Sequence, residues 1–231
     1  MTPIGASAPG KALLCGEYAV LEGAPAVVAA VDRRVSVTWT DDPGPMPPEV
    51  EATLRLAEAE LGPGPRWLNL DVSDLQQDRV KLGLGSSAAA AVAAAGASFA
   101  TRGHDLGDSE ILRRVFSLSF EGHASIAPQG SGVDVAASTF GGFLRFARDR
   151  NGAKTCALER PLGLVIRLVW TGQAARTSEL VGKVRELRRN DRGTYGACMG
   201  QLSELSDRFA SAFETGSTTE VIEAAASYAT A

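Results

Sequence analysis

The sequence is poor in several features that mark particular classes of protein. Its 231 residues include three cysteines, Cys15, Cys156 and Cys198, which are odd in number and far from any metal-ligand spacing. We therefore expect reduced thiols with mostly structural roles. No apolar run reaches the roughly 18 residues of a membrane span, and the first residues lack the basic and long apolar segments of a secretory signal. These absences predict a cytoplasmic protein with no membrane partner.

An excess of positive charge is also missing. Lys and Arg number 23 against 27 Asp and Glu, which gives a formal net charge of -4. This balance offers no electrostatic reason to bind nucleic acid, so small molecules are the expected partners. With 45% hydrophobic residues, the chain has enough apolar side chains for one large core or two smaller ones.

The apolar patterning predicts an α+β protein. Val- and Ala-rich stretches indicate strands at 12–14 and 26–39, and helical spacing indicates a helix at 49–61 that ends at Gly62. An Ala-rich helix is expected from 86 to about 100, and another from Ser109, as N-cap, to about 124. Strands are expected again at 141–148 and 163–170, and the remaining expected helices cover residues 178–189, 194–213 and 218–229.

A weak domain boundary lies near residues 149–154, "DRNGAK", or just before Pro161. We therefore assign an N-terminal domain to residues 1–155 and a C-terminal domain to residues 156–231.

The stretch "KLGLGSSAAAAVAAA", residues 81–95, places glycines and serines directly before the Ala-rich helix. Glycine lets the backbone approach a ligand closely, and the first N–H groups of a helix have no partner within the helix. Together they form a cradle for an anion such as phosphate, where the hydroxyl of Ser86 or Ser87 can reach Mg²⁺. The alternative is a tight turn into a buried helix with no ligand.

A second motif overlaps this stretch. Gly83, Gly85 and Ala88 match the dinucleotide fingerprint G-x-G-x-x-G/A, and Asp105 follows about 20 residues later. That fingerprint needs a buried strand on each side, whereas "LQQDRVKLG" and "TRGHDLGDSE" are polar. A Walker sequence is also missing, so the pattern favours a phosphate loop of another type.

Four ordered segments resemble the GHMP kinases, a family of small-molecule kinases named for galactose, homoserine, mevalonate and phosphomevalonate. The segments are "SAPGKALLCGEYAVLEGAPAVVAAVDRRV" at 7–35, "GLGSSAAAAVAAA" at 83–95, "GSGVDVAASTFGGFLRF" at 130–146 and "WTGQAARTSELVGKV" at 170–184. The resemblance implies a ribosomal protein S5 domain 2-like N-terminal domain and a partial ferredoxin-like C-terminal domain. It also implies ATP and Mg²⁺ as cofactors, with the ATP phosphates held by Gly83, Leu84, Gly85, Ser86, Ser87 and Ala88.

The resemblance implies a catalytic pair, Asp134 and Lys11. Asp134 lies among small residues at an expected tight turn, where its carboxylate can act as a base or orient the acceptor. Lys11 would hold Asp134 ionised and neutralise developing charge. From the residues alone, Asp134 could equally be a turn cap and Lys11 a solvated lysine.

Further residues are expected on the acceptor side, again by resemblance. These residues are Lys11, Glu17, Tyr18, Ser131, Gly132 and Thr177. The alternative for them is a role in a turn or in packing, and for Thr177 it is the N-cap of a helix. Ser86 and Glu121 are the candidate Mg²⁺ ligands. Many family members carry a Mg²⁺-binding glutamate 11 residues before the catalytic aspartate, where this sequence has His123. The motif therefore leaves the second Mg²⁺ ligand unassigned.

The expected acceptor is phosphomevalonate, with mevalonate as the alternative. "GEY" at 16–18, "GSGVDVA" at 130–136 and "WTG" at 170–172 are most similar to family members that act on phosphomevalonate. A catalytically silent nucleotide-binding homologue is the other reading, because nothing after Gly193 resembles the family's third glycine-rich motif. We therefore expect that the natural chain continues, that part of the site is lost, or that another chain completes it. A broken C-terminal sheet would expose strand edges and favour a homodimer.

Overall fold

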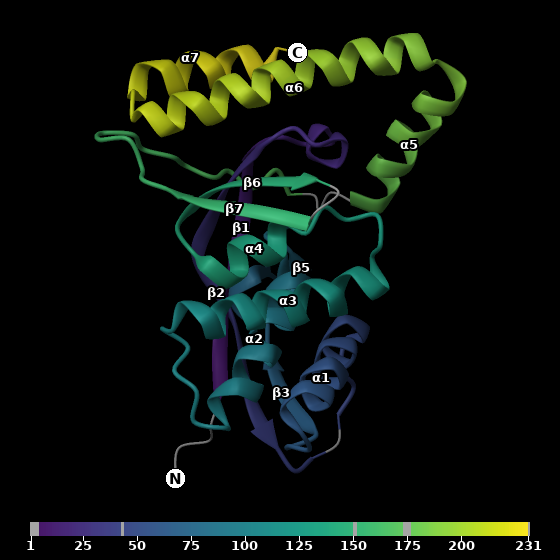
Figure 1. Cartoon of the computed structure of the whole chain (residues 1–231), viewed down its shortest axis with the longest axis vertical. Coiled ribbons are helices and arrows are strands. Elements are labelled where there is room, and N and C mark those ends of the chain that lie inside the picture. Colours follow the sequence, from purple (N-terminus) through teal and green to yellow (C-terminus); the bar gives the residue numbers. More distant parts are fainter. Residues whose placement is uncertain (1–4, 43, 150–151, 173–176, 231) are drawn as a thin grey trace. The chain divides into compact units, whose positions relative to one another are not determined.

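The structure is a computed structural model that describes residues 5–42, 44–149, 152–172 and 177–230 (Figure 1). The chain groups into two compact units. Unit 1 contains residues 1–12 and 30–141, and unit 2 contains residues 13–29 and 142–231. The domain boundary expected between residues 155 and 156 would fall inside strand β7 (Gly152–Leu158). The assignment of domains to residues 1–155 and 156–231 stays a prediction from the sequence.

The main sheet has five strands in the order β1-β2-β6-β7, with β3 paired to β2 outside this path. The expected strands at 12–14 and 26–39 are confirmed as parts of β1 and β2, and the strand at 141–148 is confirmed as β6. The strands of this sheet besides β7 are β1 (Gly5–Cys15), β2 (Ala26–Thr40), β3 (Trp67–Asp71) and β6 (Phe143–Asp149). In unit 1, β3 pairs antiparallel with the end of β2, from Ser36 opposite Asp71 to Thr40 opposite Trp67.

Unit 1 adds four helices and two short elements to its strands. The helices are α1 (Pro48–Leu61), α2 (Ser86–Ala100), α3 (Ser109–Ile126) and α4 (Val133–Phe140). A 3₁₀ turn, η2 (Ser73–Leu75), precedes a small hairpin of β4 (Gln76–Gln77) and β5 (Val80–Lys81). α1 begins with Pro48 in its first turn, where proline loses no intrahelical hydrogen bond.

The core of unit 1 surrounds α2. Residues 88–99 of this helix are all buried, so its alanines face protein on every side. Small side chains let neighbouring helices approach, and α1, α3 and α4 all contact α2. α1 and α3 approach each other closely at Gly122, where a Cβ would collide with Thr53 Oγ1.

Unit 2 has its own core between a hairpin and a helical layer. β6 and β7 pair antiparallel from Phe143 opposite Leu158 to Asp149 opposite Gly152, so Asp149 and residues 152–154 of the expected boundary belong to these two strands. The helices of unit 2 are α5 (Thr177–Asn190), α6 (Arg192–Thr215) and α7 (Thr218–Ala229), and a 3₁₀ turn, η1 (Ala19–Glu22), joins β1 to β2. α6 and α7 lie side by side (Figure 1).

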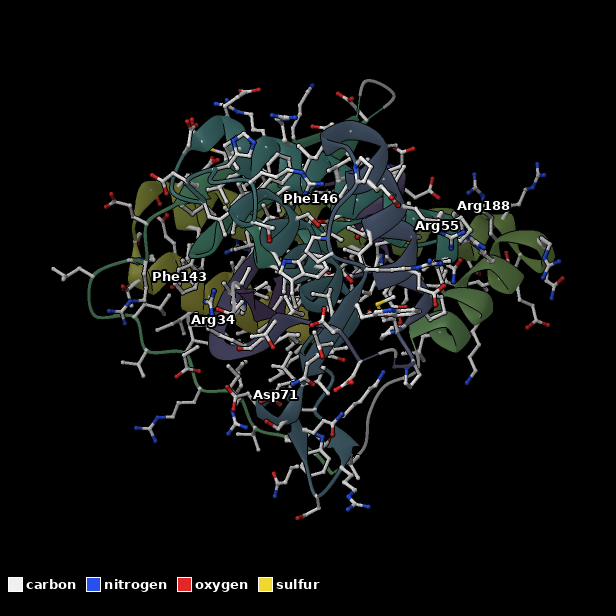
Figure 2. The ribbon with its side chains drawn as sticks, turned by 90° about the horizontal axis from the view of Figure 1, so that it is seen from below. Arg34, Arg55, Asp71, Phe143, Phe146 and Arg188 are labelled. Carbon is white, nitrogen blue, oxygen red and sulfur yellow. The ribbon has the colours of Figure 1, made fainter. Side chains whose placement is uncertain are left out.

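Aromatic side chains of β6 and α6 meet in the unit 2 core. Phe143 and Phe146, labelled in Figure 2, both belong to β6. The Phe143 ring lies 5.5 Å from that of Phe213, and Phe209 lies 5.6 Å from Phe213, so β6 and α6 share one aromatic cluster. The buried Cys15 and Val27 pack in the same cluster.

Two expectations of local structure are wrong. The N-cap of α3 is Asp108 and not Ser109, because the Asp108 carboxylate accepts a hydrogen bond from the Glu110 N–H at 2.7 Å. Residues 163–170 form no strand. No neighbouring strand pairs with this stretch among the described residues, so its β-favouring side chains have no sheet to join. Val165 and Val169 are 69% and 86% exposed.

Replacement of Gly122 tests the contact between α1 and α3. In Gly122→Ala the new methyl group would overlap the side chain and the backbone of Thr53, which lies 2.8 Å away at Cα. We expect the free energy of unfolding to fall by about 1–3 kcal/mol in urea denaturation. The matched control is Gly200→Ala in α6, where nothing lies within 4 Å of the new methyl group and a gain of about 0.5–1 kcal/mol is expected. Equal effects of the two substitutions would contradict the close approach.

Candidate active site

The glycine-rich loop before α2 is bound to the first strand. The Lys11 N–H donates a hydrogen bond to the Leu84 carbonyl at 2.8 Å. The adjacent residue, Gly10, has no room for a side chain, because its Cβ would lie 2.7 Å from that same carbonyl oxygen and 2.8 Å from Leu75 Cδ2. In the sequence "PGK" of β1, the Lys11 N–H thus hydrogen-bonds the loop, and the absence of a side chain at Gly10 lets the loop backbone pack against the strand.

Gly85 brings the loop to both members of the expected catalytic pair. It adopts φ 77° and ψ 37°, a left-handed conformation that favours glycine, and it is the N-cap of α2. A Cβ at this position would lie 3.0 Å from Lys11 Cγ, 3.4 Å from Lys11 Cε and 3.8 Å from Asp134 Cβ. Lys11 and Asp134 therefore meet beside the same glycine, although they are 123 positions apart in the chain.

The first turn of α2 leaves backbone donors available. Gly85 provides no side-chain cap, so the N–H groups that begin the helix have no side-chain partner. Ser87 Oγ lies 3.3 Å from His123 Nε2 on α3, within hydrogen-bond distance, whereas Ser86 has no side-chain hydrogen bond to the described residues. Of the two serines, Ser86 is thus the one whose hydroxyl is available to a ligand.

Asp134 lies in the first turn of α4, where the sequence alone suggested only a tight turn. The helix was not expected because it has eight residues and follows a glycine-rich segment. The Asp134 carboxylate accepts a hydrogen bond from the Val135 N–H at 3.0 Å, and the Lys11 ammonium makes no ion pair with the described residues. The Lys11 ammonium is therefore not neutralised by a carboxylate of the described residues.

The turn before α4 is also specified by glycine. Gly132 has φ 84°, and its Cβ would collide with the Phe120 ring. Ser131 Oγ accepts a hydrogen bond from the Val133 N–H at 3.3 Å. The side chain of Phe120, on α3, thus occupies the space beside Gly132, a packing role that no sequence pattern indicated.

Glu17 and Tyr18 lie in unit 2, in the turn between β1 and η1. Tyr18 has φ 60° and ψ -46°, and the Ala19 N–H donates to the Glu17 carbonyl at 2.6 Å. This is a γ-turn with positive φ, a rare and strained conformation for a non-glycine residue. Glu17 Oε2 is buried and has no hydrogen-bond partner among the described residues.

The remaining expected site residues have little structural context. Thr177 begins α5, and its side chain lies outside the described residues. Glu121 is exposed on α3 and forms no ion pair in the described part of the chain. Among the residues that the structure describes, no group of three or more His, Cys, Asp or Glu side chains is placed to hold a metal ion. Mg²⁺ at phosphate sites needs only one or two protein ligands besides the phosphates, so Ser86 and Glu121 stay predictions.

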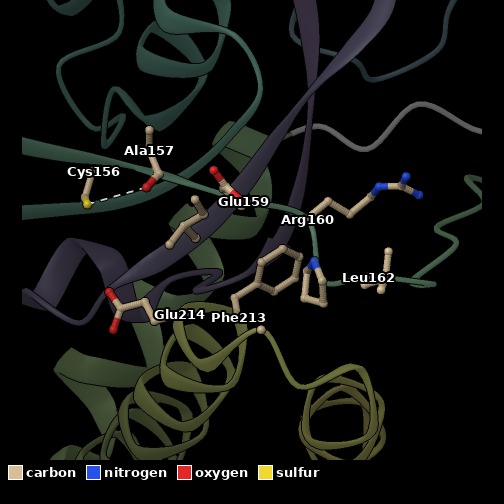
Figure 3. Close-up of a pocket in the computed structure, with 10 residues that line it drawn as sticks. Cys156, Ala157, Glu159, Arg160, Leu162, Phe213 and Glu214 are labelled. Carbon is tan, nitrogen blue, oxygen red and sulfur yellow. Dashed lines mark hydrogen bonds between the residues drawn. The ribbon is translucent and has the colours of Figure 1, made fainter.

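A cavity of about 600 Å³ lies within unit 2, at the end of β7 and α6 (Figure 3). Its lining includes Cys156, Glu159, Arg160 and Phe213, and the Cys156 thiol donates to the Ala157 carbonyl at 3.6 Å. None of the expected site residues lines this cavity. In the described structure no helix has the length and apolarity needed to cross a membrane.

Comparison with known proteins agrees with these features. The family described as the GHMP kinases N terminal domain matches residues 50–142, which include the glycine-rich loop and Asp134. A phosphomevalonate kinase of Streptomyces sp. (strain CL190) is 29% identical over 81% of this chain and 66% of its own length. A mevalonate kinase of Methanothermobacter thermautotrophicus is 31% identical over 87% of this chain and 68% of its own length.

The fold also matches a solved structure. Streptococcus pneumoniae phosphomevalonate kinase, in complex with phosphomevalonate and AMPPNP, has a TM-score of 0.76 at 19% identity and covers 98% of this chain and 79% of its own. The chain spans 61% to 68% of the length of the curated relatives that it matches. From the matched domain, the identity to the relatives and the common fold, the chain belongs to the GHMP kinase family.

Proposed function

We propose that this chain is part of an ATP-dependent phosphotransferase that transfers the γ-phosphoryl group of ATP to phosphomevalonate, giving diphosphomevalonate. The observation that carries the proposal is the approach of Lys11 and Asp134 to Gly85, at the end of a loop that begins a helix. A cation, a carboxylate and free backbone N–H groups beside one glycine are protein groups that can position and stabilise a phosphoryl group during its transfer.

The residues of the loop fit the phosphates of ATP. The first-turn N–H groups of α2 and the positive end of its dipole favour an anion, and the glycines at 83 and 85 expose the backbone. Ser86 is the residue proposed to reach Mg²⁺, with Glu121 as the second candidate. Bound MgATP would supply the phosphoryl group and a metal ion that neutralises part of its charge.

Lys11 and Asp134 have separate roles in this proposal. The Lys11 ammonium attracts the transferred phosphate and stabilises negative charge that develops on its oxygens. Asp134 orients the acceptor. A phosphate acceptor is already anionic and hardly needs a base, so with phosphomevalonate the carboxylate mainly positions, whereas with mevalonate it would also accept the hydroxyl proton. Glu17, Tyr18, Ser131, Gly132 and Thr177 are proposed to serve the acceptor.

Mevalonate is the second candidate acceptor. Three of the four curated relatives are mevalonate kinases, at 31% to 33% identity. Phosphomevalonate is preferred because Tyr18 in "GEY" stands where mevalonate kinases usually have histidine, and because "GSGVDVA" and "WTG" resemble the phosphomevalonate form.

A pair of glycine substitutions tests the phosphate loop. Gly85→Ala and Gly83→Ala impose similar backbone strain, since the two φ angles are 77° and 78°. Only at position 85 does the new methyl group meet Lys11, whereas nothing lies within 4 Å at position 83. We expect Gly85→Ala to weaken binding of a fluorescent ATP analogue at least tenfold, about 1.4 kcal/mol, and Gly83→Ala to weaken it much less. Equal losses would assign the effect to backbone strain alone.

The proposed reaction is tested by ADP formation with MgATP and a panel of mevalonate, phosphomevalonate, galactose and homoserine. We expect a signal with phosphomevalonate that falls roughly a thousandfold in Asp134→Ala while ATP affinity stays nearly constant. The exposed Asp41→Ala serves as the control for loss of one carboxylate. A signal with mevalonate alone would transfer the proposal to that acceptor. ATP binding without ADP formation from any acceptor would favour a silent nucleotide-binding homologue.

A further inference from the structure

The turn that carries Glu17 and Tyr18 is held in a strained conformation by groups from several parts of unit 2. The positive φ of Tyr18 is unfavourable for a non-glycine residue and persists only where the surroundings enforce it. Gly16, just before it, has φ 95°, and its Cβ would lie 2.6 Å from Ala26 Cα and 2.8 Å from the Pro25 carbonyl oxygen. The turn is thus packed directly against the start of β2.

One side chain fixes this turn from the other end of the sequence. The Gly16 N–H donates a hydrogen bond of 3.0 Å to the hydroxyl oxygen of Tyr228 on α7, 212 positions away. The Val20 N–H donates to the Gly16 carbonyl at 3.1 Å, so both polar backbone groups of Gly16 are bonded. Because the first of these bonds comes from a side chain, it can be removed without a change to the turn's own sequence.

The surroundings of Tyr228 place it against Glu17 as well as Gly16. Burial, and then the negative charge of Glu17, raise the pKa of Tyr228 to about 12. Burial and the same carboxylate contribute to raise the pKa of Cys15 to about 12. Tyr228 and Cys15 therefore stay neutral at physiological pH, and both are near enough to the Glu17 carboxylate to be affected by its charge. Its buried Oε2 has no donor among the described residues, and a ligand hydroxyl is a group that could supply one.

We propose that Tyr228 is a positioning residue for the acceptor: through its bond to Gly16 it holds the Gly16–Tyr18 turn in the strained form that presents Glu17 and Tyr18 to the substrate. This inference rests on the proposed function, which assigns Glu17 and Tyr18 to the acceptor. Tyr228 acts through the turn and is not itself a catalytic residue.

The test compares Tyr228→Phe with a matched removal of one hydroxyl. Tyr195→Phe is the control, because the Tyr195 hydroxyl donates to Glu22 at 2.6 Å at the far end of η1 and leaves the turn untouched. Calorimetric titration measures the dissociation constants of phosphomevalonate, mevalonate and a non-hydrolysable ATP analogue for the wild type and both variants. Thermal melts verify that each variant folds.

We expect Tyr228→Phe to weaken acceptor binding by roughly three- to tenfold, the effect of one lost hydrogen bond, and to leave the affinity for the ATP analogue unchanged. Tyr195→Phe should bind both ligands like the wild type. Unchanged acceptor affinity in Tyr228→Phe, or an equal loss for acceptor and nucleotide, would overturn the positioning role while the proposed function stands. A wild-type chain that binds neither acceptor would overturn the proposed function and, with it, this inference.

Discussion

The hydrogen bond from the Lys11 N–H to the Leu84 carbonyl joins the first strand to the phosphate loop, and the candidate site depends on it. A loop of glycine and serine has few side chains of its own with which to hold a position. The bond holds the loop beside the aliphatic part of the Lys11 side chain. Because Gly10 and Gly85 have no side chains, the Leu84 carbonyl can approach Gly10, and Lys11 can approach Gly85. The alanines of α2 complete the arrangement, because a buried helix of small side chains gives the loop a rigid support.

Positive φ angles occur at positions expected to meet a ligand, as well as at other turns of the described chain. Gly85 and Gly132 have positive φ beside Lys11 and before Asp134, where glycine bears the conformation at little cost. Tyr18 has positive φ without that freedom. Its turn is held by Gly16, by the packing of Ala26 and by Tyr228, which is the kind of external support that a strained conformation requires.

Local signals in the sequence were enough for most elements of the fold. The expected helix at 218–229 matches α7 at both ends, and α2 begins and ends where the alanine run predicts. The prediction of a strand at 163–170 was wrong because a strand needs a neighbouring strand to pair with, and a local pattern of β-branched side chains does not show whether one is present. The helix α4 was missed because its eight residues are too few for a periodic pattern.

The candidate site divides in the same way between local and long-range information. The order and spacing of Lys11, the glycine-rich loop and Asp134 could be recognised from the sequence, whereas their approach to Gly85 required the fold. The pairing of Ser87 with His123 and of Gly16 with Tyr228 joins residues that no local pattern relates. These contacts arise from packing between elements, which single-sequence reasoning does not determine.

The central claim is that the loop before α2 binds the phosphates of ATP next to Lys11 and Asp134. The most direct measurement is titration of ¹⁵N-labelled protein with a magnesium complex of a non-hydrolysable ATP analogue, followed by NMR of the backbone amides. The account predicts saturable shifts that are largest at Gly83, Gly85 and Ser86. Saturable binding that leaves these three amides unchanged, or no binding at all, would contradict it.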